Sequence, residues 1–217
     1  MALLAGLEFH FDLDFQEVPL QEAERYLEEL TSKYANLIYD QKTTIHVRLQ
    51  EGSLKVTLAV IGALYIGIGQ YGSFRSGIDY MIKDAKSLKS LVTSEIVKNG
   101  MNEADIIESK RMHCDPDKIR RVLLAIDRLE SKKSKSNINE ELSRIRASVR
   151  NICNTLSEED AGFFAISIKA TYWPQDREIP YFIERYKLVA RKEDIVHHPV
   201  ASIDQPRVNK ALQRTSR

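Results

Sequence analysis

Residues 7–15 alternate strictly between apolar and polar side chains, and this period of two constrains the fold more than any other feature. The apolar members, which share one face of an extended chain, are Leu7, Phe9, Phe11, Leu13 and Phe15. A strand with one buried face needs neighbouring strands and a covering layer. The period then changes to that of a helix over residues 20–39. The inward stripe predicted for this helix is Leu20, Ala23, Leu27, Leu30, Tyr34 and Leu37.

Alternation returns after the helix and predicts a hairpin. Residues 43–49 alternate with their apolar side chains inward, and residues 54–60 alternate again. Gly52 lies between them and suits the positive φ of a tight turn. We therefore predict a β-α-β-β unit over residues 5–62, in which the helix covers one face of the sheet.

Helical patterning dominates the middle of the chain, residues 73–156. The predicted helices are a long one from a Ser73 N-cap to Asn99, a short one over residues 103–111, and two that begin at Asp115 and Ile138. The last two are joined by a short polar connector, so we expect them to form an antiparallel helical hairpin.

The C-terminal part alternates once more. Residues 163–172 are predicted to form a strand, and residues 181–190 to pair with it in a β-hairpin within residues 162–191. Residues 196–217 are polar and basic and are predicted to be a flexible tail. The fold class is therefore α+β, with one domain over residues 1–195.

Charge and cysteine content exclude several classes of protein. The 32 basic and 31 acidic residues nearly cancel, which leaves no overall field to attract nucleic acid. The basic sector of the helical hairpin has no aromatic residues among its members, which are Lys132, Lys133, Lys135, Arg144, Arg146 and Arg150. Two cysteines, Cys114 and Cys153, are too few for a disulfide scaffold or a four-cysteine zinc site. With no secretory signal in the first residues, they favour a reducing, cytoplasmic location.

No group of residues satisfies the requirements of a catalytic or metal site. The outward face of the first strand carries Glu8, His10, Asp12 and Asp14, which is typical of a solvated face. His113, Cys114 and Asp115 are adjacent in the chain, so their side chains point apart and do not form a nucleophile with its base. We predict no catalytic residue, no metal and no cofactor.

A glycine motif keeps one enzymatic alternative open. Gly67, Gly69 and Gly72 match the G-x-G-x-x-G pattern that lets a backbone approach a pyrophosphate at a helix N-terminus. A second parallel strand with an acidic residue about 20 positions later does not follow in the sequence. A nucleotide-binding enzyme that uses this turn is therefore an alternative and not the leading interpretation.

The same region raises a membrane alternative. Residues 56–74 carry no charge and lie between Lys55 and Arg75, close to the length of a membrane span. The run begins as a well-patterned strand and contains four glycines, so a buried core segment is the favoured interpretation. A membrane-acting effector stays as the second alternative.

The blocks from Glu51 to Val56 (EGSLKV) and from Tyr71 to Ile78 (YGSFRSGI) resemble a segment of small bacterial proteins from anti-phage and other conflict loci. The resemblance implies an adaptor, sensor or toxin-partner role and carries over no catalytic residue. Our leading hypothesis is a non-enzymatic interaction or regulatory module of a bacterial defence system. We expect protein partners, a second copy of the chain among them. The predicted contact residues are Gly69, Tyr71, Gly72, Phe74 and Arg75.

Overall fold

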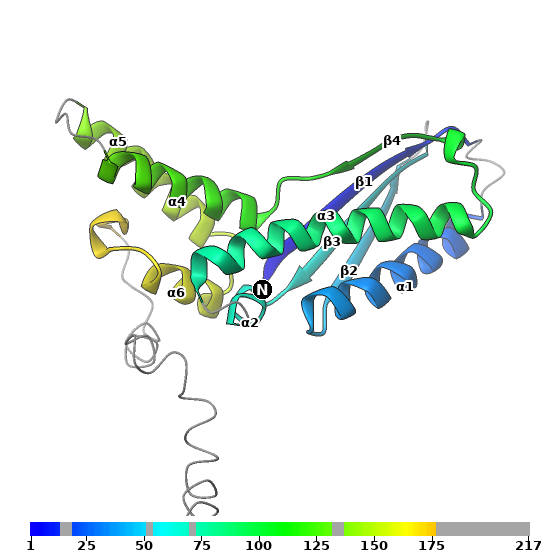
Figure 1. The fold of residues 1–217 in the computed structure, drawn as a ribbon, viewed down its shortest axis with the longest axis horizontal. Helices are drawn as coiled ribbons and strands as arrows, with labels where there is room; N and C mark the ends of the chain where they lie inside the picture. Colours follow the sequence, from blue (N-terminus) through cyan, green and yellow to red (C-terminus); the bar gives the residue numbers. More distant parts are fainter. Residues whose placement is uncertain (14–18, 51–53, 70–72, 132–136, 177–217) are drawn as a thin grey trace, which may run out of the picture.

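A computed structural model describes residues 1–13, 19–50, 54–69, 73–131 and 137–176, and Figure 1 shows their arrangement. Four strands form one antiparallel sheet in the order β2-β3-β1-β4. They are β1 (Ala2–Phe11), β2 (Thr44–Gln50), β3 (Leu54–Gly62) and β4 (Ile106–Arg111). The α-helices are α1 (Leu20–Tyr39), α2 (Leu64–Gly69), α3 (Phe74–Lys98), α4 (Asp115–Ser131), α5 (Ile138–Cys153) and α6 (Glu158–Ile166). Two short 3-10 helices also occur, η2 (Glu103–Asp105) and η3 (Ala170–Tyr172).

The helical connections skip one strand each. β1 is joined to β2 through α1, with β3 between the two strands, and β3 is joined to β4 through α2 and α3, with β1 between them. This is the split β-α-β connectivity of ferredoxin-like sheets. The predicted α+β class and the N-terminal β-α-β-β unit are confirmed. Connectivity of this kind supports many activities and identifies none.

The main core lies between the sheet and helices α1 and α3, which cover the same face in Figure 1. β1 and β3 alternate as predicted and bury Phe9 and Leu58 completely. Met81 and Leu88 of α3 are buried opposite them. Burial of each of these side chains contributes roughly 1.5–3 kcal/mol. Helices α4, α5 and α6 lie beside one end of the sheet, and α4 and α5 pack as the predicted hairpin.

The prediction of a helix over residues 103–111 is wrong. Residues 103–105 form η2, and Ile106–Arg111 form β4, which pairs with β1. The amide of Asp12 also donates to the Asp105 carbonyl at 2.8 Å. The free edge of β1 supplies hydrogen-bond partners that an isolated segment lacks, so tertiary pairing overrides the weak helical pattern.

The prediction of a strand over residues 163–172 is also wrong. Most of this segment belongs to α6 and η3. Ser157 caps α6 by accepting from the Asp160 amide at 3.3 Å, and the first turn of the helix is acidic, which favours helix at this position. The predicted pairing strand 181–190 and the tail 196–217 lie outside the described residues. The first strand also begins earlier than predicted, at Ala2, and ends at Phe11.

Candidate interaction surfaces

The segment that joins β3 to α3 contains the residues predicted to contact a partner. β3 continues to Gly62, and Gly67 and Gly69 lie within the short helix α2. Ser73 caps α3 as predicted, because its hydroxyl accepts from the Ser76 amide. Tyr71 and Gly72 lie outside the described residues.

Phe74 and Arg75 are engaged within the chain. The Phe74 ring packs against the rings of Phe163 and Phe164, with centroid distances of 5.6 and 6.0 Å. The Arg75 guanidinium donates two hydrogen bonds to the Asp127 carboxylate, at 2.5 and 2.9 Å. These bonds raise the pKa of Arg75 and lower that of Asp127. Both side chains therefore hold the start of α3 against α6 and α4.

The helix N-termini near the glycines already carry protein groups. The Tyr65 amide, at the start of α2, donates to Oδ1 of Asp160 at 3.1 Å. At the start of α3 the Ser73 hydroxyl accepts from the Ser76 amide in the same way. An anion such as a pyrophosphate would bind at these amides, so the arrangement gives the nucleotide alternative little support.

The described residues of the uncharged run 56–74 are divided mainly among β3, α2 and the first residue of α3. Its first part is the inner strand β3, which pairs with β1 on one side and β2 on the other. None of the helices in the described ranges combines the length and the apolar character that a membrane-spanning helix needs.

Three buried aspartates occupy the junction between the sheet and the C-terminal helices. Asp115 accepts from the Leu3 amide of β1 at 2.8 Å and from Nζ of Lys118 at 2.8 Å. Asp160 accepts from the Tyr65 amide and from the Ser157 hydroxyl, the latter at 2.9 Å. Each carboxylate therefore ties a C-terminal helix to a backbone amide of the N-terminal part.

The third aspartate, Asp117, forms a two-pronged ion pair. Both terminal nitrogens of Arg111 donate to it, at 2.6 and 2.7 Å, and the Cys114 amide donates at 3.0 Å. Burial would raise the pKa of Asp117, but the bonds from Arg111 and the Cys114 amide lower it below its usual value. Burial also raises the pKa of the Cys114 thiol to about 12, so the thiol is not activated as a nucleophile. The His113-Cys114-Asp115 motif thus contributes to this junction.

The outward polar face of the sheet is paired across strands. Lys110 of β4 lies 3.0 Å from the Glu8 carboxylate of β1 and 3.6 Å from that of Glu108. Within the described ranges, no cluster of three or more histidine, cysteine, aspartate or glutamate side chains is arranged to hold a metal ion.

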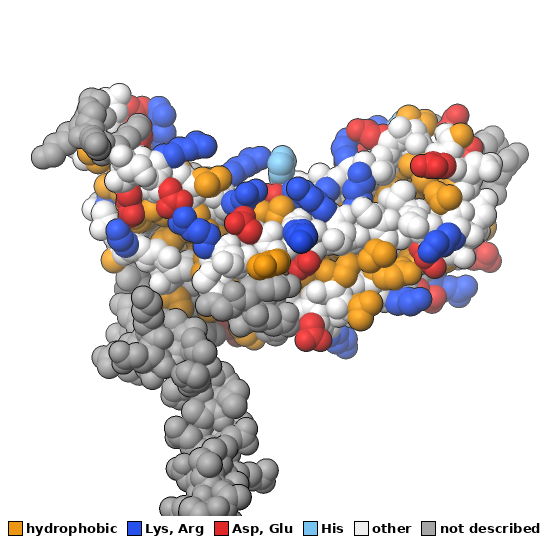
Figure 2. Space-filling model, viewed as in Figure 1, with side chains coloured by type: hydrophobic (Ala, Val, Ile, Leu, Met, Phe, Trp, Pro, Cys, Tyr) orange, Lys and Arg blue, Asp and Glu red, His pale blue; other side chains and the backbone are white. Residues whose placement is uncertain are grey.

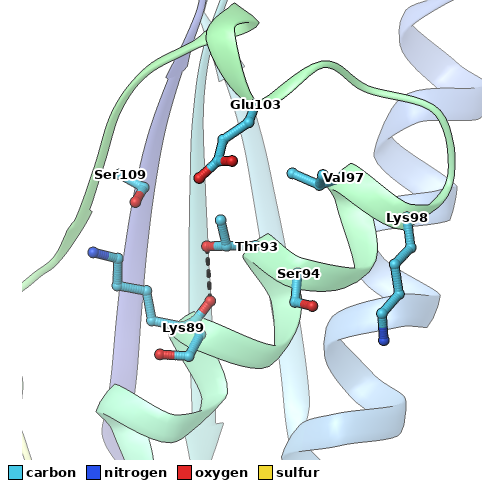
Figure 3. A pocket seen from close by; sticks show the side chains of 8 residues that line it. Lys89, Thr93, Ser94, Val97, Lys98, Glu103 and Ser109 are labelled. Carbon is cyan, nitrogen blue, oxygen red and sulfur yellow. Dashed lines mark hydrogen bonds between the residues drawn. The ribbon is translucent and has the colours of Figure 1, made fainter.

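A depression of about 440 Å³ lies between the C-terminal half of α3 and β4, as Figure 3 shows. Its lining is Lys89, Ser90, Thr93, Ser94, Val97, Lys98, Glu103 and Ser109. The Thr93 hydroxyl donates to the Lys89 carbonyl at 2.9 Å. Two lysines and one glutamate around several hydroxyls make a mixed polar surface, without a set of charges directed at one point.

The three arginines of the predicted basic sector have partners. Arg144 pairs with Glu140 at 2.5 Å, Arg146 donates to the Thr171 carbonyl at 3.0 Å, and Arg150 pairs with Asp176. The predicted basic sector is thus partly neutralised. Its lysines at 132, 133 and 135 lie outside the described residues.

Four large apolar side chains are exposed on α1 and α3, and we call them the α1–α3 surface. They are Tyr26 (38% exposed), Leu37 (76%), Tyr80 (47%) and Leu91 (40%). In each helix the two residues are separated by 11 positions, about three turns, so they lie on one side of the helix. Figure 2 shows hydrophobic side chains gathered where α1 and α3 run side by side.

Two contacts orient this surface. The Tyr26 hydroxyl accepts from the Asn99 side chain at 2.8 Å, so the start of α1 lies beside the end of α3. Asp79 of α3 pairs with Arg120 of α4 at 2.8 Å, on a flank of α3 turned well away from Tyr80. A hollow of about 470 Å³ continues the surface at the Tyr26 end, lined by Leu13, Tyr26, Ile96, Asn99, Gly100, Met101 and Asp105.

The α1–α3 surface was not predicted from the sequence. The prediction that Leu37 faces inward is wrong, because its side chain is 76% exposed. Tyr26, Tyr80 and Leu91 had no predicted role. The signal was the repeated spacing of 11 residues outside the core stripe of each helix.

Comparisons of the chain with protein-family models, curated proteins and solved structures found no match.

Proposed function

We propose that this chain is a non-enzymatic interaction module of a bacterial defence system, and that it binds a protein partner through the α1–α3 surface. The observation that carries the proposal is the exposure of Tyr26, Leu37, Tyr80 and Leu91 together on two adjacent helices. Exposed apolar side chains grouped in this way are typical of binding surfaces. The defence context comes from the resemblance of the EGSLKV and YGSFRSGI blocks.

The shape of the surface favours one kind of partner. The antiparallel helices α1 and α3 each present two apolar side chains about 16 Å apart along the helix axis. An amphipathic helix of about three turns, with apolar residues at helical spacing, fits between two such rows. Tyrosines suit this role because each presents a large rigid ring with a polar end.

The test compares three forms of the full chain as bait in the native host. Leu37→Ser/Leu91→Ser removes apolar area from both helices, while Leu124→Ser changes a comparably exposed leucine (42%) on α4. Wild type and Leu124→Ser should capture the same partner in equal amounts. Leu37→Ser/Leu91→Ser should capture at least tenfold less of it. In a phage-challenge assay, protection should fall with the same variant. Equal capture and protection by all three forms would overturn the proposal.

Arg75→Ala tests the contact site predicted from the sequence in the same experiment. Its bonds to Asp127 are exposed, so the variant should fold normally. Loss of the partner with Arg75→Ala, and not with Leu37→Ser/Leu91→Ser, would place the contact at the start of α3.

Two further measurements address the alternatives. A membrane-acting effector would float with liposomes and release their contents, whereas an interaction module stays with the soluble fraction. A nucleotide at about 100 times its dissociation constant would stabilise a nucleotide-binding enzyme by about 2.7 kcal/mol, which a thermal-shift screen detects.

A further inference from the structure

The two edges of the sheet differ in how they are protected. β2 is seven residues long and pairs with β3 from Thr44 to Gln50 without a register shift. Within the described part of the chain, no strand pairs with its outer side. β4, at the other edge, has a register shift opposite His10 and Phe11 and carries the ion-paired Lys110.

Edge strands expose unpaired amides and carbonyls, and proteins usually protect them with lysines, prolines, bulges or inward charges. β4 has several of these features, since Glu108, Lys110 and Arg111 lie within its six residues. β2 has the sequence Thr-Ile-His-Val-Arg-Leu-Gln, with Arg48 as its one residue of fixed charge. A regular strand of this composition is ready to pair with another strand.

We propose that β2 pairs antiparallel with β2 of a second copy of the chain, about a two-fold axis at Val47. The pairing would join two four-stranded sheets into one continuous sheet of eight strands. This inference goes beyond the proposed function, because it concerns a different surface and a different partner.

The second copy is the partner that the strand itself matches. Pairing about Val47 places Ile45 opposite the second copy's Leu49 and Val47 opposite its counterpart, so apolar residues meet apolar residues on the helix-covered side. On the other side Thr44 meets Gln50, and His46 meets Arg48. Val47 and Leu49 are half-buried in the single chain and would gain cover. A closed two-fold contact of this kind is the commonest arrangement of homo-oligomers.

The pairing leaves the α1–α3 surface accessible. Extension of the sheet about an axis perpendicular to it keeps α1 and α3 of both copies on the same side. Partner binding and self-pairing can therefore be measured separately, and the failure of one leaves the other standing.

A cysteine on the axis tests the geometry. Cα atoms of directly opposed residues in antiparallel strands lie about 4.5–5.5 Å apart, within the range that a disulfide spans. Full-length Val47→Cys should form a covalent dimer under mild oxidation. Ile107→Cys, on the exposed part of β4, is the matched control and should remain uncoupled. The native Cys114 and Cys153 are both buried and should not react.

Charge variants at exposed positions test the same contact in solution. His46→Lys places a lysine opposite the second copy's Arg48 at two symmetric positions, which should raise the dimer dissociation constant about tenfold. His46→Lys/Arg48→Glu should restore pairing, and the control Ile107→Lys should leave the constant unchanged. Sedimentation equilibrium of the full chain measures all three.

Three outcomes would overturn the proposal. The first is a chain that stays monomeric into the hundreds of micromolar and, as the Val47→Cys variant, gives no crosslink. The second is a dimer whose dissociation constant does not respond to His46→Lys. The third is more efficient crosslinking of the Ile107→Cys variant than of the Val47→Cys variant, which would place the contact at β4.

Discussion

Between the sheet and helices α1 and α3, most of the fully buried side chains are apolar, such as Phe9, Leu58 and Leu88, whereas three buried side chains at the junction with the C-terminal helices are aspartates. The first interface is held by removal of apolar area from water, which is strong and non-directional. The second has apolar packing as well, such as that of Phe74 on Phe164, but it also has carboxylates that accept from specific amides and from Arg111, and these contacts are directional.

Because of this difference, the two interfaces should tolerate substitutions to different degrees. An apolar interface tolerates changes of side chain if volume is kept, and it loses uniqueness before it loses stability. A buried carboxylate tolerates little, because a lost partner leaves an unpaired polar group. The junction aspartates therefore define the position of the C-terminal helices relative to the sheet, while the apolar core supplies most of the stability.

The largest effect should come from the apolar side of this comparison. Phe9→Ala removes a completely buried ring from β1 and should lower the free energy of unfolding by about 3–5 kcal/mol. Urea titration measures the loss, with the exposed Leu37→Ala as control. A cost below about 1 kcal/mol would show that the ring does not pack as described.

The next effect concerns the junction. Asp160→Ala leaves the Tyr65 amide and the Ser157 hydroxyl without their acceptor and should cost about 2–4 kcal/mol. Glu159→Ala, one residue earlier and exposed, should be nearly neutral. Equal costs for the two variants would break the distinction between junction and surface carboxylates.

A pH series should sharpen the comparison. The pKa of Asp117 is lowered in the folded chain, so its contribution to stability is present above the ordinary carboxyl pKa of about 3.9 and is lost as the pH falls through the folded value. Asp117→Asn should cost about 1–2 kcal/mol at pH 7 and progressively less towards pH 3. A constant difference across that range would contradict the ion pair with Arg111.

The smallest expected effect is a gain on the apolar side. Thr31 of α1 is completely buried, and its hydroxyl has no hydrogen-bond partner among the described residues. Thr31→Val keeps the shape and removes the unpaired oxygen, so the free energy of unfolding should rise by about 1 kcal/mol. Thermal denaturation detects the change, and a loss of stability instead would indicate a partner for the hydroxyl.

The same division explains which elements could be predicted from the sequence. α1 and β3 have clear periods, and the cap at Ser73 and the start of α4 at Asp115 have local signals. All of these were predicted correctly. Periodicity works here because one face of each element meets hydrocarbon.

The elements near the junction were predicted less well for a physical reason. Phe164, Ile166 and Ile168 alternate as a strand would, but Ser157 and the acidic residues after it start a helix. β4 depends on the edge of β1, and the aspartates depend on amides far away in the chain. The spacing of apolar residues along the sequence does not reveal hydrogen bonds between residues that are far apart in the chain. The pairing of Arg75 with Asp127, at the predicted contact site, is likewise hidden from sequence patterns, because it joins residues 52 positions apart.

The aspartate contacts also have a consequence for the order of folding. Leu3 and Asp115 are 112 positions apart, and Tyr65 and Asp160 are 95 apart. Contacts of such separation raise the contact order of the chain and slow its folding. During synthesis β1 is made well before β4, its second neighbour in the sheet, which begins at Ile106. The second edge of β1 therefore stays uncovered until synthesis has reached β4.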